Sequence, residues 1–157
     1  MTNAGFTDLL LGFLALLLVY AAAVDVRTFT ISNKLTLSVA ALAPLYWWAA
    51  DLSLWPGAAV QLGVAASVFA LLAVAFFVGM MGGGDVKLAA ALALWFSPAA
   101  TMQFLVVMSI AGGVLTLLVV ALHRLRGKLG RPEIPYGVAI AFGGIAILTQ
   151  RFLNQFA

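Results

Sequence analysis

The chain has no cysteine and very few charged side chains. Of its 157 residues, 8% are charged and 65% are hydrophobic, and the mean hydropathy is +1.16. Soluble domains carry about 25% charged residues, so the composition predicts a protein that lies in a bilayer. The missing cysteine excludes disulfides, a thiolate nucleophile and cysteine-based zinc sites. The single histidine, His123, excludes a cluster of histidine ligands, and we expect neither a metal nor another cofactor.

The apolar residues form six runs, which predict about six transmembrane helices in a single all-α, polytopic domain over residues 1–157. The runs are Phe6–Val24, Leu35–Ala50, Ala58–Met80, Val86–Phe96, Ala99–Leu122 and Ile134–Leu153. A spanning helix needs about 20 residues. The fourth run is shorter and is closed by Ser97-Pro98, which leaves five or seven spans as alternatives. Residues Met1 to Phe6 carry no positive charge, which argues against a secretory signal peptide.

The basic residues lie almost entirely in alternate connections between these runs. They are Arg27 and Lys34 after the first run, Lys87 after the third, and Arg124, Arg126, Lys128 and Arg131 after the fifth. Only Arg151, near the C-terminus, departs from this pattern. Because basic connections stay in the cytoplasm, both termini are predicted to face outside. The net charge of +3 then reflects membrane topology and lipid headgroups, and nucleic-acid binding is not expected.

The same topology sorts the acidic residues. Asp8 and Asp51 are expected on the outer side, and Glu133 is expected to be a solvated partner of Arg131. Asp25 and Asp85 are expected on the cytoplasmic side, where each directly adjoins an apolar run. A carboxylate at the edge of an apolar segment is costly and usually functional.

Local structure offers an explanation for one of these two acids. Asp85 could cap the helix that begins at Val86 by accepting its first N–H groups. Asp25 lies at the C-terminal end of the first run, where the helix dipole disfavours a negative charge. Arg27 does not offset this cost, because residues two apart on a helix do not face each other.

Two carboxyl groups at one depth suggest a catalytic pair. When such groups come close, one keeps a proton while the other stays charged. The charged group can remove a proton from water and the neutral one can protonate a carbonyl oxygen, as in aspartic proteases. We therefore expect Asp25 and Asp85 to share the base and acid roles, with either assignment open.

The residues around Asp85 fit such a site. Gly82, Gly83 and Gly84 are expected to form an open loop with positive φ that receives the substrate backbone. Lys87 is expected either to extend to the membrane interface or to help keep Asp85 ionised.

Two smaller patterns predict ordinary membrane packing. Tyr46, Trp47, Trp48 and Trp55 are expected to form an interfacial aromatic belt. Gly112-Gly113 and Gly143-Gly144 are expected to allow close helix contact.

Three stretches carry a resemblance to a known family. Gly82-Gly83-Gly84-Asp85, followed by Val86-Lys87-Leu88, resembles the Gly-x-Gly-Asp signature of the type IV prepilin peptidases. These are membrane aspartic proteases of a class that also includes presenilins and preflagellin peptidases. The stretch "DVRTFTISNKLT" is similar to the family's first-aspartate region, and "IPYGVAIAFGG" is similar to its Pro-Tyr-Gly segment.

The resemblance implies that Asp25 and Asp85 are catalytic and that the glycines and Lys87 lie near the substrate. The implied substrate is a type IV prepilin-like precursor, whose short basic leader is removed beside its hydrophobic N-terminal helix. The reaction would take place at the cytoplasmic face of the prokaryotic inner membrane. The chain lacks cysteine and has only Arg27 to Lys34 between its first two runs, so it resembles the short form associated with Flp-type, tight-adherence pili. N-methylation is not predicted.

Three alternatives remain open at this stage. An archaeal-type preflagellin peptidase is a close relative with the same chemistry. A proton-coupled transporter would place acids through the depth of the bilayer and often shows interrupted helices in two halves, and the sequence shows neither feature. A scaffold subunit of a secretion assembly would need no pair of acids at all.

Overall fold

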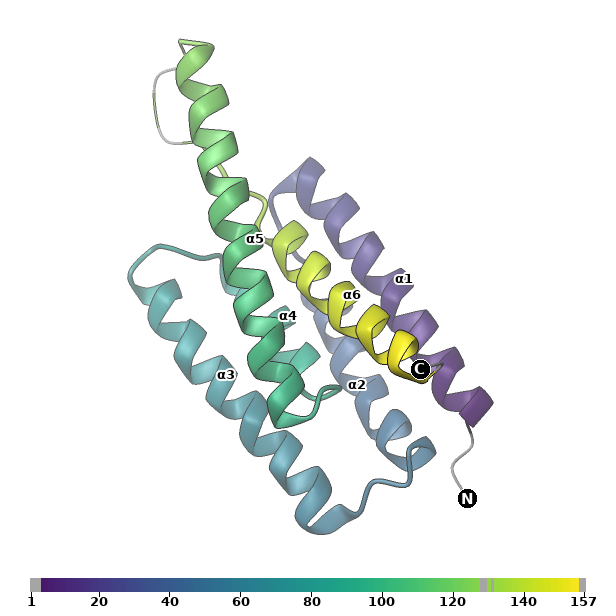
Figure 1. Ribbon diagram of the computed structural model, residues 1–157. Coiled ribbons are helices and arrows are strands. Elements are labelled where there is room, and N and C mark those ends of the chain that lie inside the picture. Colours follow the sequence, from purple (N-terminus) through teal and green to yellow (C-terminus); the bar gives the residue numbers. More distant parts are fainter. Residues whose placement is uncertain (1–3, 128–129, 131, 156–157) are drawn as a thin grey trace.

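The computed structural model describes residues 4–127, 130 and 132–155, and its regular elements in these parts are helices (Figure 1). In chain order they are α1 (Ala4–Thr28), α2 (Asn33–Ala49), the π-helical turn η1 (Leu54–Ala58), α3 (Ala59–Phe77), α4 (Gly83–Ala93), α5 (Pro98–Leu125) and α6 (Tyr136–Gln155). Each of the six apolar runs overlaps one α-helix, so the all-α prediction is confirmed for the described residues. Glu133 is exposed, and its expected partner Arg131 lies outside the described residues.

Four of these segments are long and apolar enough to cross a membrane, when η1 and α3 are taken together. They are Ala4–Thr28, Leu54–Phe77, Pro98–Leu125 and Tyr136–Asn154. By contrast, α2 has 17 residues and contains Pro44. The 11 residues of α4 extend about 16 Å at 1.5 Å each, roughly half of the hydrocarbon thickness. The protein is therefore a polytopic helical membrane protein, while the count of six spans and the orientation remain predictions.

The last helix, α6, packs along both α1 and α5 (Figure 1). Its glycines allow this contact: a Cβ at Gly143 would lie 3.2 Å from Met108 of α5, and one at Gly144 would lie 2.8 Å from a methyl group of Leu18 in α1. The prediction of close packing is thus confirmed for this glycine pair. In the pair Gly112-Gly113 it is confirmed for Gly112 only, because a Cβ at Gly113 would meet nothing within 4 Å.

The short helix α4 lies inside the bundle, against α2, α3 and α6. Two indole groups fix its C-terminal end to α2. Trp95 Nε1 donates to the carbonyl oxygen of Val39 at 2.9 Å, and Trp47 Nε1 donates to the carbonyl oxygen of Leu94 at 2.7 Å. With one end held in this way, the position of the other end, which carries Asp85, is also restricted.

The aromatic belt prediction is wrong for Tyr46. Tyr46 is buried, and its ring stacks on Trp95 with 5.1 Å between the ring centroids. Trp47 is half-buried because it bonds to the end of α4. Trp48 and Trp55 are exposed. Sequence position alone did not separate rings that face inward from rings that face outward on α2.

The connection between α1 and α2 is short and well defined. The N–H of Phe29 donates to the carbonyl oxygen of Asp25 at 2.8 Å, and Phe29 has a φ of 51°, a left-handed conformation that ends α1. Ser32 then caps α2, because its hydroxyl accepts the N–H of Leu35 at 3.3 Å. Ile31, between these two residues, is thereby directed into the bundle, where it is 9% exposed.

Candidate active site

Asp25 continues the buried face of α1. Leu14, Leu18 and Ala21 are fully buried at alternating spacings of four and three residues, and Asp25 follows at the next such position with 2% exposure. Residues at these spacings lie on one face of a helix. The carboxyl group therefore points into the bundle, whereas Arg27 is exposed.

The N-terminus of α6 meets the Asp25 carboxylate. The backbone N–H of Gly137 donates to Asp25 Oδ2 at 2.7 Å, while the N–H of Val138 donates to the carbonyl oxygen of Pro135 at 3.2 Å. The first N–H groups of a helix have no acceptor within the helix and carry a partial positive charge. Such a helix end stabilises an anion. A Cβ at residue 137 would lie 2.8 Å from Asp25 Oδ2, so only glycine fits this approach.

Asp85 lies in the first turn of α4 and is 8% exposed. Its Oδ2 accepts the backbone N–H of Gly82 at 3.2 Å. Gly82 is the N-cap residue and Asp85 is the third helical residue, so the alternative in which Asp85 is itself the N-cap is wrong. Its carboxylate does take part in capping, because it accepts the N–H of the N-cap residue. Burial raises the pKa of Asp85, and the negative charge of Asp25 raises it further, against the opposing effect of the Gly82 hydrogen bond.

The three glycines before Asp85 do not form an open loop. Gly82 has φ −72°, Gly83 and Gly84 belong to α4, and none has a positive φ, so this prediction is wrong. Their role is to leave room for close contacts. A Cβ at residue 84 would lie 2.8 Å from the carbonyl oxygen of Ile31, and one at residue 82 would lie 2.7 Å from Asp85 Oδ2. A Cβ at residue 83 would lie 3.3 Å from the ring of Phe76, which can rotate.

Ile31 joins the two halves of the site. Its backbone lies against Gly84, next to Asp85, and its Cδ1 is 2.8 Å from where a Cβ of Gly137 would stand. Gly137 in turn donates to Asp25. The end of α1 and the beginnings of α4 and α6 therefore converge around one side chain. This convergence brings the two buried carboxyl groups to the same end of the bundle, close enough for one to affect the other.

Lys87 points away from this convergence. Its side chain is exposed, and Nζ donates to Asn33 Oδ1 at 2.9 Å, which ties α4 to the start of α2. The shift in the pKa of Asp85 comes from burial, the charge of Asp25 and the Gly82 N–H, and Lys87 is not among these causes. The contact that the structure shows for Lys87 is the one that joins α4 to α2. Within the described parts of the chain, no group of three or more His, Asp or Glu side chains is placed to hold a metal ion.

Gly137 is the residue of the site whose role was not predicted. The segment around it, "IPYGVAIAFGG", is one of the three that resemble the family, but nothing local in the sequence connects it with an aspartate 112 residues earlier. The buried stripe of α1 was a second available signal. Its spacing of three and four residues leads from Leu14 to Asp25 and indicates an inward-facing carboxyl group.

Comparison with known proteins gives one match. The model of the type IV leader peptidase family matches residues 12–117, more than half of the chain. No curated protein and no solved structure matches. The matched residues include Asp25 and Gly82 to Asp85, whereas α6 lies beyond them. The chain belongs to the type IV leader peptidase family.

Proposed function

We propose that this protein is a membrane-embedded aspartic endopeptidase, in which Asp25 and Asp85 form the catalytic pair. Its family makes it a type IV leader peptidase-like protease. The observation that carries the aspartic mechanism is the convergence of two buried carboxyl groups around Ile31. Neither group has a basic side chain among the hydrogen-bond partners that the structure describes for it, and both instead accept backbone N–H groups.

The surroundings of the two acids support different roles. Asp25 faces the N-terminus of a 20-residue helix, where a negative charge is favoured. Asp85 has a raised pKa, so it keeps its proton over a wider pH range than an ordinary carboxyl group. We assign Asp25 as the ionised general base and Asp85 as the neutral general acid.

With these roles, hydrolysis proceeds in two balanced steps. Asp25 takes a proton from water as the water oxygen bonds to the scissile carbonyl carbon, and Asp85 gives its proton to the carbonyl oxygen. The product is a neutral gem-diol. In the second step Asp25 returns its proton to the amide nitrogen, the C–N bond breaks, and Asp85 recovers a proton from a gem-diol hydroxyl. The pair ends in its starting state, as general acid–base catalysis requires.

The site end of the bundle is proposed to face the cytoplasm. Among the described residues, five basic side chains belong to connections or helix ends at this end, and Arg151 lies at the other. The five are Arg27, Lys34, Lys87, Arg124 and Arg126. The positive-inside rule then places both termini outside. We propose the prokaryotic inner membrane as the location, because a leader peptidase-like protease with its site in the cytoplasm would meet its precursors there.

The proposed substrate is a type IV prepilin-like precursor, of the Flp type, with a basic leader and a hydrophobic N-terminal helix. The described site contains no acidic cluster that would bind a basic leader beyond the pair itself. The leader's charge has another use, because the positive-inside rule keeps the leader in the cytoplasm while the hydrophobic helix enters the bilayer. The junction between them is thereby held at the membrane surface, near the depth of Asp25 and Asp85.

The test is leader removal in membranes that contain the protein and a co-expressed Flp-type prepilin. Asp25→Asn and Asp85→Asn are each expected to abolish cleavage. Asp8→Asn is the matched control, because it removes an acid from the opposite end of α1. Full cleavage by either site variant would end the proposal of a catalytic pair. Cleavage of a preflagellin but not of the prepilin would keep the chemistry and replace the substrate.

A further inference from the structure

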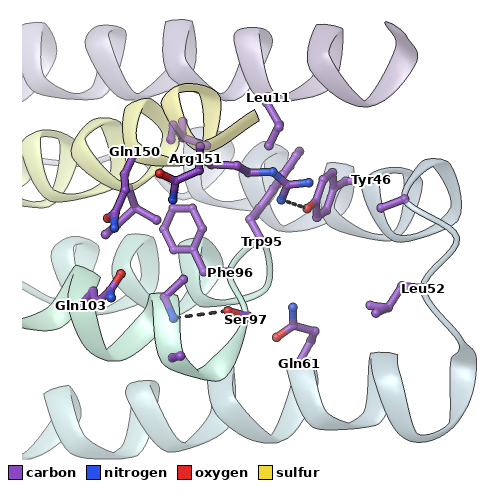
Figure 2. A pocket seen from close by; sticks show the side chains of 16 residues that line it. Leu11, Tyr46, Leu52, Gln61, Trp95, Phe96, Ser97, Gln103, Gln150 and Arg151 are labelled. Carbon is purple, nitrogen blue, oxygen red and sulfur yellow. Dashed lines mark hydrogen bonds between the residues drawn. The ribbon is translucent and has the colours of Figure 1, made fainter. Parts of the chain in front are cut away.

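The end of the bundle opposite Asp25 contains a polar cavity of about 670 Å³ (Figure 2). It lies among α1, α2, α3, α5 and α6, and its wall includes amide, hydroxyl and guanidinium groups within an otherwise apolar protein. The polar side chains include Gln61, Ser97, Gln103, Gln150, Arg151 and Asn154. None of the lining residues that the structure describes is an aspartate or a glutamate.

Arg151 supplies a positive charge to this cavity. It is half-buried, its guanidinium donates to the hydroxyl of Tyr46, and its Cζ lies 5.4 Å from the centroid of that ring. Figure 2 shows the side chain extended from α6 across the cavity toward Tyr46. These contacts use only part of a group with five N–H donors. A positive charge held among apolar helices is favourable when an anion accompanies it.

Gln61 is the second sign that a ligand belongs here. It is a lone amide in the apolar helix α3, it is 8% exposed, and its Oε1 has no hydrogen-bond partner. In Figure 2 it extends from α3 into the space between Ser97 and Leu52. Burying a polar atom without a partner is costly. The cost is offset if a hydroxyl-bearing ligand occupies the cavity and donates to this oxygen.

The start of α5 adds one further donor. Ser97, Ala99 and Ala100 line the cavity at the N-terminus of this 28-residue helix. Pro98 has no N–H. The N–H of Ala100 donates to the Ser97 hydroxyl, and the N–H of Thr101 donates to the Ser97 carbonyl oxygen. This leaves the N–H of Ala99 for a ligand. A helix N-terminus and a guanidinium on facing walls create a positive potential between them.

We propose that this cavity binds the headgroup of an anionic phospholipid that carries hydroxyl groups, such as phosphatidylglycerol. The phosphate would be held by Arg151 and the start of α5, and the glycerol hydroxyls by the side-chain amides. Leu11, Leu52 and Ile147 also line the cavity, which suits the first methylene groups of acyl chains and disfavours a free phosphate ion. Because no lining residue that the structure describes carries a carboxylate, an amine-bearing headgroup would lack a partner among them.

Native mass spectrometry of the protein purified in a neutral detergent tests this proposal. Phosphatidylglycerol and phosphatidylcholine with identical acyl chains are titrated separately. The wild type is expected to bind phosphatidylglycerol at least tenfold more tightly. Arg151→Gln removes the charge and is expected to lose about tenfold of that affinity. Arg126→Gln, which removes an exposed arginine at the opposite end, is the control and is expected to change the affinity less than twofold.

A second variant and a competition distinguish the alternatives. Gln61→Leu is expected to weaken phosphatidylglycerol binding several-fold while raising the melting temperature of the lipid-free protein, and it serves if Arg151→Gln does not fold. Equal binding of the two lipids, or unchanged phosphatidylglycerol binding by both variants, would overturn the proposal. Displacement of the lipid by millimolar inorganic phosphate would assign the site to a free anion and would overturn the proposal that it binds a phospholipid.

Discussion

The backbone N–H of Gly137 donates a 2.7 Å hydrogen bond to Asp25 Oδ2, and thereby joins the start of the last helix to the end of the first. Gly137 lies outside the residues that match the family model, although its partner lies within them. Asp25 lies at the C-terminal end of α1, where the helix dipole disfavours a negative charge, and the N-terminal end of α6 stabilises that charge instead. In the proposed mechanism, Gly137 is a positioning residue, which would act on the reaction through Asp25.

Gly137→Ala is expected to lower kcat at least tenfold with little change in KM. The added methyl group would stand 2.8 Å from both Asp25 Oδ2 and Ile31 Cδ1, so the helix end must withdraw from the carboxylate. Gly113→Ala is the control, because a Cβ there meets nothing within 4 Å. Initial rates of prepilin cleavage over a range of substrate concentrations provide the measurement. A wild-type kcat for Gly137→Ala would remove the positioning role.

Two neighbouring glycines of α4 are expected to respond differently to alanine. At residue 84 the new methyl group would meet a backbone carbonyl oxygen at 2.8 Å, which cannot move without displacing the α1–α2 connection. At residue 83 it would meet the ring of Phe76 at 3.3 Å, which can rotate away. Gly84→Ala should therefore lower both the melting temperature and the cleavage rate, while Gly83→Ala should retain most of each. Equal effects would contradict this account of the glycines.

The stability of the protein is expected to depend on pH through Asp85. Because its folded-state pKa is raised above the ordinary carboxyl value, folding favours the protonated form. The stabilising contribution is complete below the unfolded-state pKa, about 3.9, and is lost as pH rises through the raised pKa. Asp85→Asn should therefore melt at a higher temperature than the wild type in alkaline buffer, with a smaller difference in acid. A difference that is constant across pH would exclude Asp85 as the cause.

Lys87 and Asn33 are expected to act as a pair that stabilises the fold. Their hydrogen bond is exposed, so removing either side chain should cost about 1 kcal/mol or less. The double variant Lys87→Met with Asn33→Ala should cost less than the sum of the single variants, because both remove the same contact. Thermal unfolding of the four proteins gives this comparison. A rise in KM for Lys87→Met that Asn33→Ala does not share would indicate a direct contact with substrate.

The sequence predicted the helices well and pointed to the two acids that prove to be buried, for a physical reason. Apolar runs long enough for a membrane have few alternatives to a helix, because backbone polar groups must be satisfied internally. Asp25 and Asp85 are easy to identify for a related reason, since a carboxyl group beside an apolar run is rare. Even the shortness of α4 could be read from the position of Ser97-Pro98, where α5 begins with Ser97 as its cap.

The contacts that complete the site could not be predicted in this way. Whether a glycine is open to substrate or pressed against another chain segment depends on tertiary packing, and Gly84 is pressed against Ile31. The same holds for Tyr46, which faces the interior although it stands beside two tryptophans near a helix end. Such contacts join residues far apart in the chain, so the residues next to each of them in the sequence do not indicate the contact.

The position of Ile31 between Gly84 and Gly137 has a genetic consequence. The Ile31 side chain fills space beside both halves of the proposed catalytic centre, so a change in the volume of any one of these three residues affects the fit of the other two. A variant damaged by an added methyl group at residue 137 should regain function through a second change that shortens residue 31, such as Ile31→Val or Ile31→Ala. A suppressor selection on Gly137→Ala should therefore return to this position, and related chains that lack one member of the trio should differ at another.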